Sequence, residues 1–331
     1  MLFAAATSLT PNIAIGSPML YAVFFAMVVG LLLVDFFTFK TPKHGQSVSL
    51  KQAGIWSAIW VCVSVLFAGG LWWYINQNFG SALANQKVGE FFTGYLLEKS
   101  LAVDNVFVWL MIFAAFAVTP AMQRKILLYG VLGAIIMRTV MIFAGAWLVT
   151  EFSWILYVFG AFLLYTGVKM WQNHDEQEDP KQSRLYRLLK KHLKVTDESN
   201  GEKFTLVKNG VKYFTPLAVV LILVELSDVI FAVDSIPAIF AVTTDPFIVL
   251  TANLLAILGL RAMFFLLSGL ADKFHLLPYA LSVILVFIGT KMLLLDVFHV
   301  PMAISLGFIA SVLTVTAILS VKFPNLGKKA P

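Results

Sequence analysis

Nine stretches of mostly apolar residues follow one another along the chain, each close to the length of a membrane-spanning helix. A helix needs about 20 such residues to cross the hydrocarbon core of a bilayer. The stretches cover residues 18–39, 54–75, 90–116, 125–149, 152–171, 215–242, 247–270, 276–296 and 301–321. Hydrophobic residues make up 60% of the 331 and charged residues 13%, whereas soluble chains average roughly 45–50% and about 25%. We therefore expect an all-α integral membrane protein with about nine transmembrane helices.

The basic residues alternate between the two sides that such helices would define. Eighteen of the 24 Lys and Arg fall in every second connection, at its border (Lys125) or after the last stretch, whereas Lys87 alone falls in the remaining connections. Because cytoplasmic loops carry the excess of Lys and Arg, the N-terminus is predicted outside and the C-terminus in the cytoplasm. The net charge of +6 then reflects membrane topology. Because the basic residues are distributed over alternate connections, they do not indicate nucleic acid as a partner. Residues 1–17 lack the basic start of a secretory signal, so we expect the first stretch to be retained.

One hydrophilic segment, residues 172–213, interrupts the apolar stretches. It opens with an acidic run and continues with a basic amphipathic stretch, 183–193, that we expect to lie along anionic headgroups. The alternating residues 204–213 surround an Asn-Gly pair, which is typical of a β-hairpin. Cys62 is the only cysteine, so the chain forms no internal disulfide or thiolate cluster, and its five scattered histidines suggest no His-rich metal site.

The sequence contains two copies of a three-helix unit. Phe-Ala-Val-Thr at 116–119 recurs at 240–243, and such order-preserving self-similarity indicates duplication. Three further pairs keep the same order and nearly the same spacing: Asp104 with Asp228, Arg138 with Arg261, and Gly167 with Gly289. Because three is odd, the second copy enters the membrane from the opposite side. Inverted repeats are typical of secondary transporters, which hold substrate near the midplane at the repeat interface.

This duplication predicts five parts of the chain. They are peripheral helices in 1–87, a first repeat in 88–171, a cytoplasmic loop in 172–213, a second repeat in 214–297, and a last helix with a cytoplasmic tail in 298–331.

Acidic residues inside the apolar stretches are the strongest functional signal. Each charge at a helix centre costs roughly 2.5–3.5 kcal/mol on insertion scales. Only two arginines lie equally deep, Arg138 and Arg261, and we expect them to act as counter-charges. The surplus of carboxylates must be neutralised by protons or by a bound cation, and a purely structural ion-pair network is the alternative. Six acids lie within the stretches: Asp35, Glu98, Asp104, Glu225, Asp228 and Asp234.

Helix geometry places these acids differently. Glu225 and Asp228 are three residues apart and share a helix face, whereas Asp234 would face another direction on an ideal helix. Pro237 removes a backbone donor and clashes with the carbonyl four residues earlier, so we predict a break there that turns Asp234 inward. Asp35 lies near the cytoplasmic end of its helix, as an interfacial acid or as the place where a cation enters.

The candidate ligands offer only oxygen. Besides the carboxylates they include Asn105 and the hydroxyls of Ser100, Ser227 and Ser235. Oxygen-only sites suit Mg²⁺, Ca²⁺ and Mn²⁺ and argue against Zn²⁺ or Cu⁺. Residue types alone do not choose among the hard divalent cations.

Two segments resemble the signature segments of the TerC family, within the LysE-type transporter superfamily. They are 98–105, Glu-Lys-Ser-Leu-Ala-Val-Asp-Asn, and 225–237, Glu-Leu-Ser-Asp-Val-Ile-Phe-Ala-Val-Asp-Ser-Ile-Pro. The likeness extends over all nine stretches and is greatest to the bacterial Alx branch, which is associated with alkaline pH and manganese. The resemblance implies Mn²⁺ export across the bacterial inner membrane, with these residues along the metal path: Glu98, Asp104, Glu225, Asp228 and Asp234.

Other functions remain open at this stage. No P-loop or other nucleotide-binding motif is present in the sequence, so we expect ion gradients or membrane potential to drive transport, with protons exchanged for Mn²⁺. We expect no enzymatic activity and no resident cofactor. The alternatives are a broad divalent cation exchanger that also carries Ca²⁺ and a membrane chaperone that assists the metallation of other proteins. An intramembrane aspartyl protease is disfavoured because the Gly-x-Gly-Asp signature is absent. The oligomeric state is left open.

Overall fold

A computed structural model describes most of the chain. The described residues are 14–38, 49–152, 154–172, 186–187, 194–196, 203–208, 210–268, 276–294, 297, 300 and 302–323. Within these ranges the description excludes the side chains of residues 103, 104, 107, 114, 115, 234, 277, 278, 302 and 303. The acidic run and most of the basic stretch of the hydrophilic segment lie outside the described residues.

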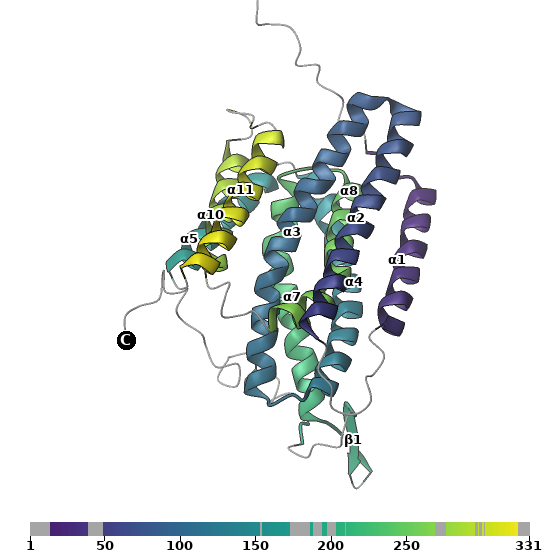
Figure 1. The fold of residues 1–331 in the computed structure, drawn as a ribbon, viewed down its shortest axis with the longest axis vertical. Helices are drawn as coiled ribbons and strands as arrows, with labels where there is room; N and C mark the ends of the chain where they lie inside the picture. Colours follow the sequence, from purple (N-terminus) through teal and green to yellow (C-terminus); the bar gives the residue numbers. More distant parts are fainter. Residues whose placement is uncertain are drawn as a thin grey trace, which may run out of the picture.

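The described residues form a helical bundle with one small hairpin (Figure 1). The helices are α1 (Pro18–Thr38), α2 (Leu50–Phe79), α3 (Ser81–Ala115), α4 (Pro120–Glu151), α5 (Ile155–Gln172), α7 (Pro216–Phe240), α8 (Pro246–Leu258), α9 (Leu260–Ser268), α10 (Leu277–Leu293) and α11 (Met302–Lys322). Each apolar stretch therefore contains a helix. Among the described residues, 5 helices are long and apolar enough to cross a membrane, or 6 if α8 and α9 form one span bent by 43°. The all-α membrane class is confirmed, while nine spans remain a prediction.

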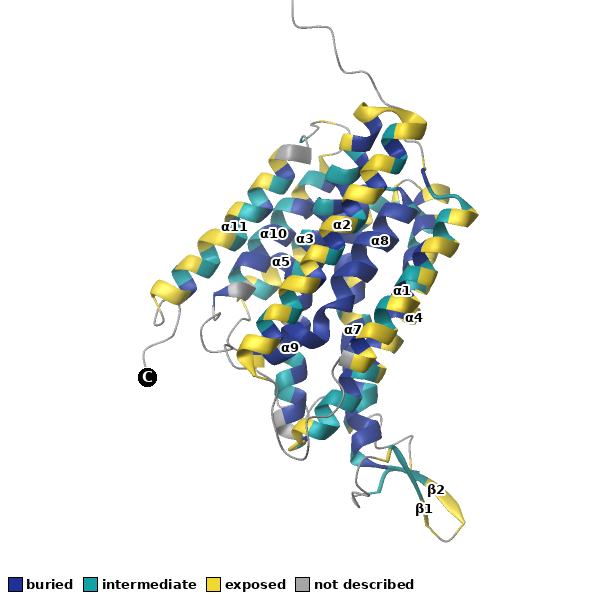
Figure 2. Ribbon diagram, turned by 45° about the vertical axis from the view of Figure 1, so that its right-hand side comes forward, coloured by how far each residue is buried: buried dark blue, intermediate teal, exposed yellow. Residues whose placement is uncertain are grey.

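Apolar side chains cover the outside of the bundle as well as its core (Figure 2). Large residues such as Leu66 and Trp73 are 74% and 63% exposed. Water-soluble proteins rarely expose contiguous apolar surface on this scale, whereas a lipid-facing surface requires it. In contrast, α8 is buried over its whole length from Phe247 to Leu258. It therefore forms the centre of the bundle.

The helices of the two expected repeats pack reciprocally. Helix α3 packs against α8, and α4 packs against α7. Helix α5 lies along α10, beside α11 in Figure 1. A Cβ added to Gly289 would lie 2.7 Å from the carbonyl oxygen of Gly160, and Ser282 Oγ donates a hydrogen bond of 2.6 Å to the carbonyl of Gly167. The spacing that relates Gly167 to Gly289 also relates Gly160 to Ser282, so each unit uses the same two positions to contact the other.

The two ends of the bundle differ. At one end α2 and α3 are joined by Gly80 alone, whose φ of 90° suits glycine. At the other end (Figure 1), β1 (Thr205–Lys208) pairs antiparallel with β2 (Val211–Phe214). This confirms the predicted hairpin, although its Asn209 lies outside the described residues. Lys125 Nζ lies 5.0 Å from the centre of the Phe204 ring, so the α3–α4 connection lies at the hairpin end.

The predicted break at Pro237 is wrong. Helix α7 runs continuously to Phe240, and the backbone N–H of Ala241 still bonds to the carbonyl of Pro237. Pro237 lies in the last turn, where it removes one hydrogen bond without ending the helix. A bend occurs instead at Gly259, between α8 and α9.

Candidate functional site

Two carboxylates from distant parts of the sequence meet one arginine inside the bundle. Arg138 of α4 donates from Nε to Asp228 Oδ2 at 3.1 Å and from Nη2 to Asp228 Oδ1 at 2.8 Å. Its Nη1 donates to Glu98 Oε1. Glu98 lies on α3, Asp228 lies on α7, and all three side chains are fully buried. The first helix of each expected repeat thus supplies one carboxylate to a shared guanidinium.

Two asparagines flank these carboxylates. Asn105 Nδ2 donates to Asp228 Oδ1 at 3.2 Å, and Asn253 Nδ2 donates to Glu98 Oε2 at 3.0 Å. Because each amide nitrogen faces a carboxylate, each amide oxygen points away from it. Neither Oδ1 has a hydrogen-bond donor among the described residues, and both are buried. Buried amide oxygens beside carboxylates are ligands that hard divalent cations accept.

Asn253 is absent from the sequence-based candidates. It lies with Thr251 in the mainly apolar helix α8, outside the two acidic segments 98–105 and 225–237. We call the following residues the central cluster: Glu98, Asn105, Arg138, Asp228, Ser235 and Asn253.

Ser235 and Glu225, the other candidates on α7, are placed differently. Ser235 Oγ accepts a hydrogen bond of 3.3 Å from Arg138 Nη1 and is buried. The half-buried Glu225 lies against Gly133 of α4, where an added Cβ would overlap its carboxylate. Glu225 and Asp228 therefore both face α4, but only Asp228 bonds to the guanidinium.

The second deep arginine pairs outside the central cluster. Arg261 Nη1 lies 2.6 Å from Asp35 Oδ2, and both side chains are buried. Asp35 belongs to α1, which lies outside both expected repeats. The two repeat-equivalent arginines thus neutralise different acids.

The side chains of Asp104 and Asp234 lie outside the described part of the structure. Among the side chains that are described, no three His, Cys, Asp or Glu residues gather closely enough to hold a metal ion. A metal path that includes all the predicted acids therefore stays a prediction.

A second buried charge cluster lies at the end opposite the hairpin. Lys87 Nζ lies 3.1 Å from Glu90 Oε2 and 3.2 Å from Asp245 Oδ2. Thr243 Oγ1 donates to Glu90 Oε2 at 2.6 Å, and Asp245 Oδ1 accepts from the backbone N–H of Phe247, capping α8. Placing Lys87 in a connection was wrong: α3 begins at Ser81, and the Lys87 side chain is fully buried.

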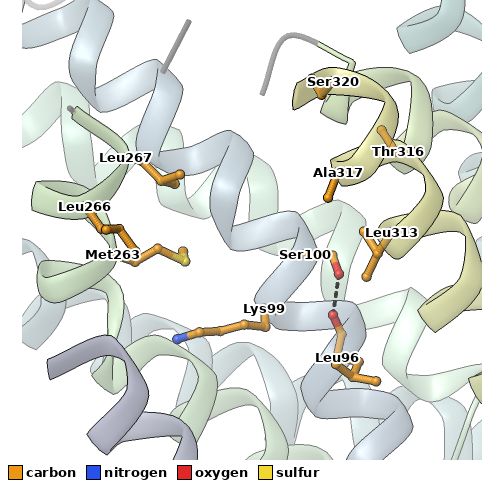
Figure 3. A pocket seen from close by; sticks show the side chains of 10 residues that line it. All are labelled: Leu96, Lys99, Ser100, Met263, Leu266, Leu267, Leu313, Thr316, Ala317 and Ser320. Carbon is orange, nitrogen blue, oxygen red and sulfur yellow. Dashed lines mark hydrogen bonds between the residues drawn. The ribbon is translucent and has the colours of Figure 1, made fainter. Parts of the chain in front are cut away.

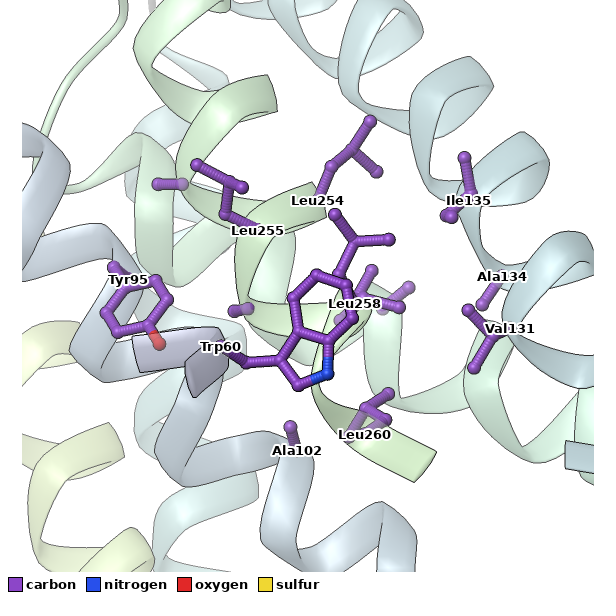
Figure 4. Packing of buried hydrophobic residues seen from close by; sticks show 14 of the residues in the cluster. Trp60, Tyr95, Ala102, Val131, Ala134, Ile135, Leu254, Leu255, Leu258 and Leu260 are labelled. Carbon is purple, nitrogen blue, oxygen red and sulfur yellow. The ribbon is translucent and has the colours of Figure 1, made fainter. Parts of the chain in front are cut away.

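Lys99 extends away from the central cluster toward the bend between α8 and α9. Its Nζ donates to the carbonyl of Ala256 at 3.0 Å, in the last turn of α8, where carbonyls lack helical partners. Trp60 packs over the same bend between Tyr95, Leu258 and Leu260 (Figure 4). An added Cβ at Gly259 would lie 2.8 Å from Lys99 Nζ and 3.0 Å from Trp60 Cβ, so a side chain there would displace the Lys99 ammonium and crowd Trp60.

A cavity of about 320 Å³ opens on the other side of Lys99, between α3, α9 and α11 (Figure 3). Its lining is mainly apolar and includes Leu96, Met263 and Leu313. None of its lining residues belongs to the central cluster. The cavity is therefore separate from the carboxylates.

Comparison with known proteins supplies a family. The model of the family described as "Integral membrane protein TerC family" matches residues 83–325. A proposed membrane-bound redox modulator, Alx, of Photorhabdus laumondii is 58% identical over 308 residues, which are 93% of this chain and 96% of the relative. The Alx protein of Escherichia coli K12 is 56% identical over 92% of this chain and 95% of its own. A membrane protein of Myxococcus xanthus is 44% identical over 93% of both chains. No solved structure matches.

Proposed function

Because the chain belongs to the TerC family of integral membrane proteins, we propose that it is a secondary transporter that exports Mn²⁺ across the cytoplasmic membrane of a bacterium. The observation that carries this proposal is the meeting of Glu98 and Asp228 in the buried central cluster. The two residues come from the first helices of the two expected repeats, and an inverted-repeat transporter holds its substrate at the interface of such repeats, which supports a substrate site there.

The reciprocal helix packing supports the inverted repeat. A twofold relation requires each contact to occur twice. If one position of the first unit contacts a different position of the second unit, the equivalents of these two positions must also contact each other. The Gly160–Gly289 and Gly167–Ser282 contacts satisfy this requirement. The packing of α3 on α8 and of α4 on α7 satisfies it at the scale of whole helices.

The charge balance of the cluster favours a cation as substrate. Glu98 and Asp228 carry two negative charges, and Arg138 carries one positive charge. The remaining polar groups are a hydroxyl and two amides, so the possible metal ligands are oxygen atoms, which hard divalent cations prefer. Mn²⁺ is proposed over Ca²⁺ and Mg²⁺ from the family resemblance. Protons are proposed as the exchanged ion because a protonated acid elsewhere on the predicted metal path would release its proton on binding metal.

The name of the Alx relatives points to a redox role, which would need a redox-active group. Cys62, the only cysteine of this chain, lies exposed on α2. A thiol–disulfide couple would therefore need a thiol from another molecule. The buried carboxylates and arginine have no direct use in such a couple, so transport accounts for more of the structure.

Cellular manganese tests the proposal. In cells that lack their own Mn²⁺ exporter, the wild type should lower intracellular manganese, measured by elemental analysis after a Mn²⁺ load. Asp228→Asn and Glu98→Gln should bring manganese back to the level of cells without the protein. Asp104→Asn and Asp234→Asn test the two acids whose side chains are not described. Glu151→Gln, at an exposed acid that ends α4, is the matched control and should export like the wild type.

Two outcomes would contradict the proposal. If Asp228→Asn and Glu98→Gln still lower manganese, the central cluster does not carry the ion. If external Ca²⁺ competes as well as Mn²⁺ in vesicles, the protein is a broad divalent cation exchanger.

A further inference from the structure

We infer that Arg138 acts as a tethered cation: its guanidinium occupies the Glu98–Asp228 pair when Mn²⁺ is absent, and Mn²⁺ displaces it. This inference rests on the proposed transport function and adds a mechanism for the return of the empty transporter. It explains why a site for a cation contains a buried arginine.

The guanidinium already uses most of the carboxylate oxygens. Both oxygens of Asp228 and Oε1 of Glu98 accept hydrogen bonds from Arg138. The remaining oxygen, Glu98 Oε2, accepts from Asn253. A metal ion that bridged the two carboxylates would need these same lone pairs. It would also be repelled strongly by a guanidinium in a buried site. Arg138 and Mn²⁺ therefore exclude each other from the pair.

The empty transporter needs a counter-charge. After Mn²⁺ leaves, Glu98 and Asp228 would be two buried carboxylates at the repeat interface, and uncompensated charge there is strongly unfavourable. With Arg138 in place the pair carries a single net negative charge and every one of its oxygens is hydrogen-bonded. The conformational change that returns the empty site is then less costly. In contrast, in the Mn²⁺-loaded form the metal itself neutralises the two carboxylates, so they no longer need the guanidinium.

The second repeat provides a natural comparison. Arg261 occupies the position equivalent to Arg138, but it pairs with Asp35 on α1. Both arginines are buried and both bond to a carboxylate. Only Arg138 lies on the carboxylates that we propose carry the ion. Only its loss should therefore slow the return of the empty transporter while leaving the movement of the loaded transporter unchanged.

Two fluxes through purified protein in liposomes distinguish this role from a structural one. Net efflux from Mn²⁺-loaded vesicles into Mn²⁺-free buffer requires the empty transporter to return. Exchange of internal radioactive Mn²⁺ for external Mn²⁺ requires only the loaded form to move. In Arg138→Gln we expect exchange to stay within about twofold of the wild type, while net efflux falls by about tenfold or more. Binding of Mn²⁺ to the variant should also be about tenfold tighter, since no guanidinium competes.

Arg261→Gln is the matched control, because it removes a buried arginine at the equivalent position. Its two fluxes should keep the wild-type ratio, whatever their absolute values. Equal changes of net efflux and exchange in a folded Arg138→Gln variant would overturn the inference. If that variant does not fold, Arg138→Lys replaces it. A lysine keeps the positive charge but loses the two hydrogen bonds that the guanidinium donates to Asp228. The ratio of net efflux to exchange should therefore fall in Arg138→Lys. An unchanged ratio would overturn the inference. A wild type that moves Mn²⁺ in neither assay would instead refute the proposed function.

Discussion

Loss of Lys87 is expected to destabilise the folded protein. Its ammonium lies between the carboxylates of Glu90 and Asp245, and the Lys87 side chain is fully buried. Lys87→Met would leave two buried acids without their counter-charge, and breaking a buried pair in this way typically costs about 3–5 kcal/mol. The free energy of unfolding, measured by denaturation in detergent micelles, should fall by that amount.

Lys51→Met is the control, because Lys51 lies exposed at the start of α2. A surface substitution of this kind usually changes the free energy of unfolding by less than about 0.5 kcal/mol. If both variants unfold alike, the buried cluster does not stabilise the fold.

Individual residues also show where sequence-based prediction ends. The buried acids Glu98 and Asp228 could be picked out because a charge inside an apolar stretch is costly. Their partners could not, because pairing depends on which faces of α3, α4 and α7 meet. Asn253 carries no charge and so gave no comparable signal, and Lys87 looked like a loop residue because it precedes the apolar part of α3.

At the scale of elements, the crossing of α5 and α10 depends on glycine. A Cβ at Gly289 would lie 2.7 Å from the carbonyl oxygen of Gly160 and 2.7 Å from the backbone nitrogen of Leu164. Backbone atoms cannot rotate away, so Gly289→Ala must push the helices apart, and overpacking of this kind costs typically about 1–3 kcal/mol. Unfolding in micelles should show that loss. Gly307→Ala in α11 meets no atom within 4 Å and should be neutral or slightly stabilising; equal losses in the two variants would refute the tight crossing.

The helices themselves were largely predictable, because long apolar runs have few other solutions in a membrane. The hairpin followed from its turn residues. The position of the bend could not be predicted from the sequence. Pro237, where a break was expected, lies so close to the end of α7 that the helix tolerates it. Gly259 is one of 21 glycines, and only the packing of Trp60 and the bond from Lys99 to Ala256 distinguish it.

At the scale of the whole molecule, the helices outside the repeats complete its charge balance. Helix α1 packs against α8 and supplies Asp35 to Arg261 of the expected second repeat. The expected first repeat instead uses its own Arg138 for Glu98. The two halves are therefore alike in helix packing but different in charge. In the proposed twofold arrangement, the shared guanidinium therefore lies on one side only.

The orientation of the molecule gives a prediction that a labelling experiment can test. The hairpin and the α3–α4 connection lie at one end, where the sequence is rich in Lys and Arg, so this end should face the cytoplasm. The α2–α3 turn lies at the opposite end. Cys62→Ser provides a cysteine-free parent, into which Lys212→Cys or Gln77→Cys introduces one exposed thiol near either end. A membrane-impermeant maleimide should label position 77 in spheroplasts and position 212 only in inverted vesicles. Labelling of both positions from the same side would refute the alternating topology, and a reversed result would refute the assigned orientation.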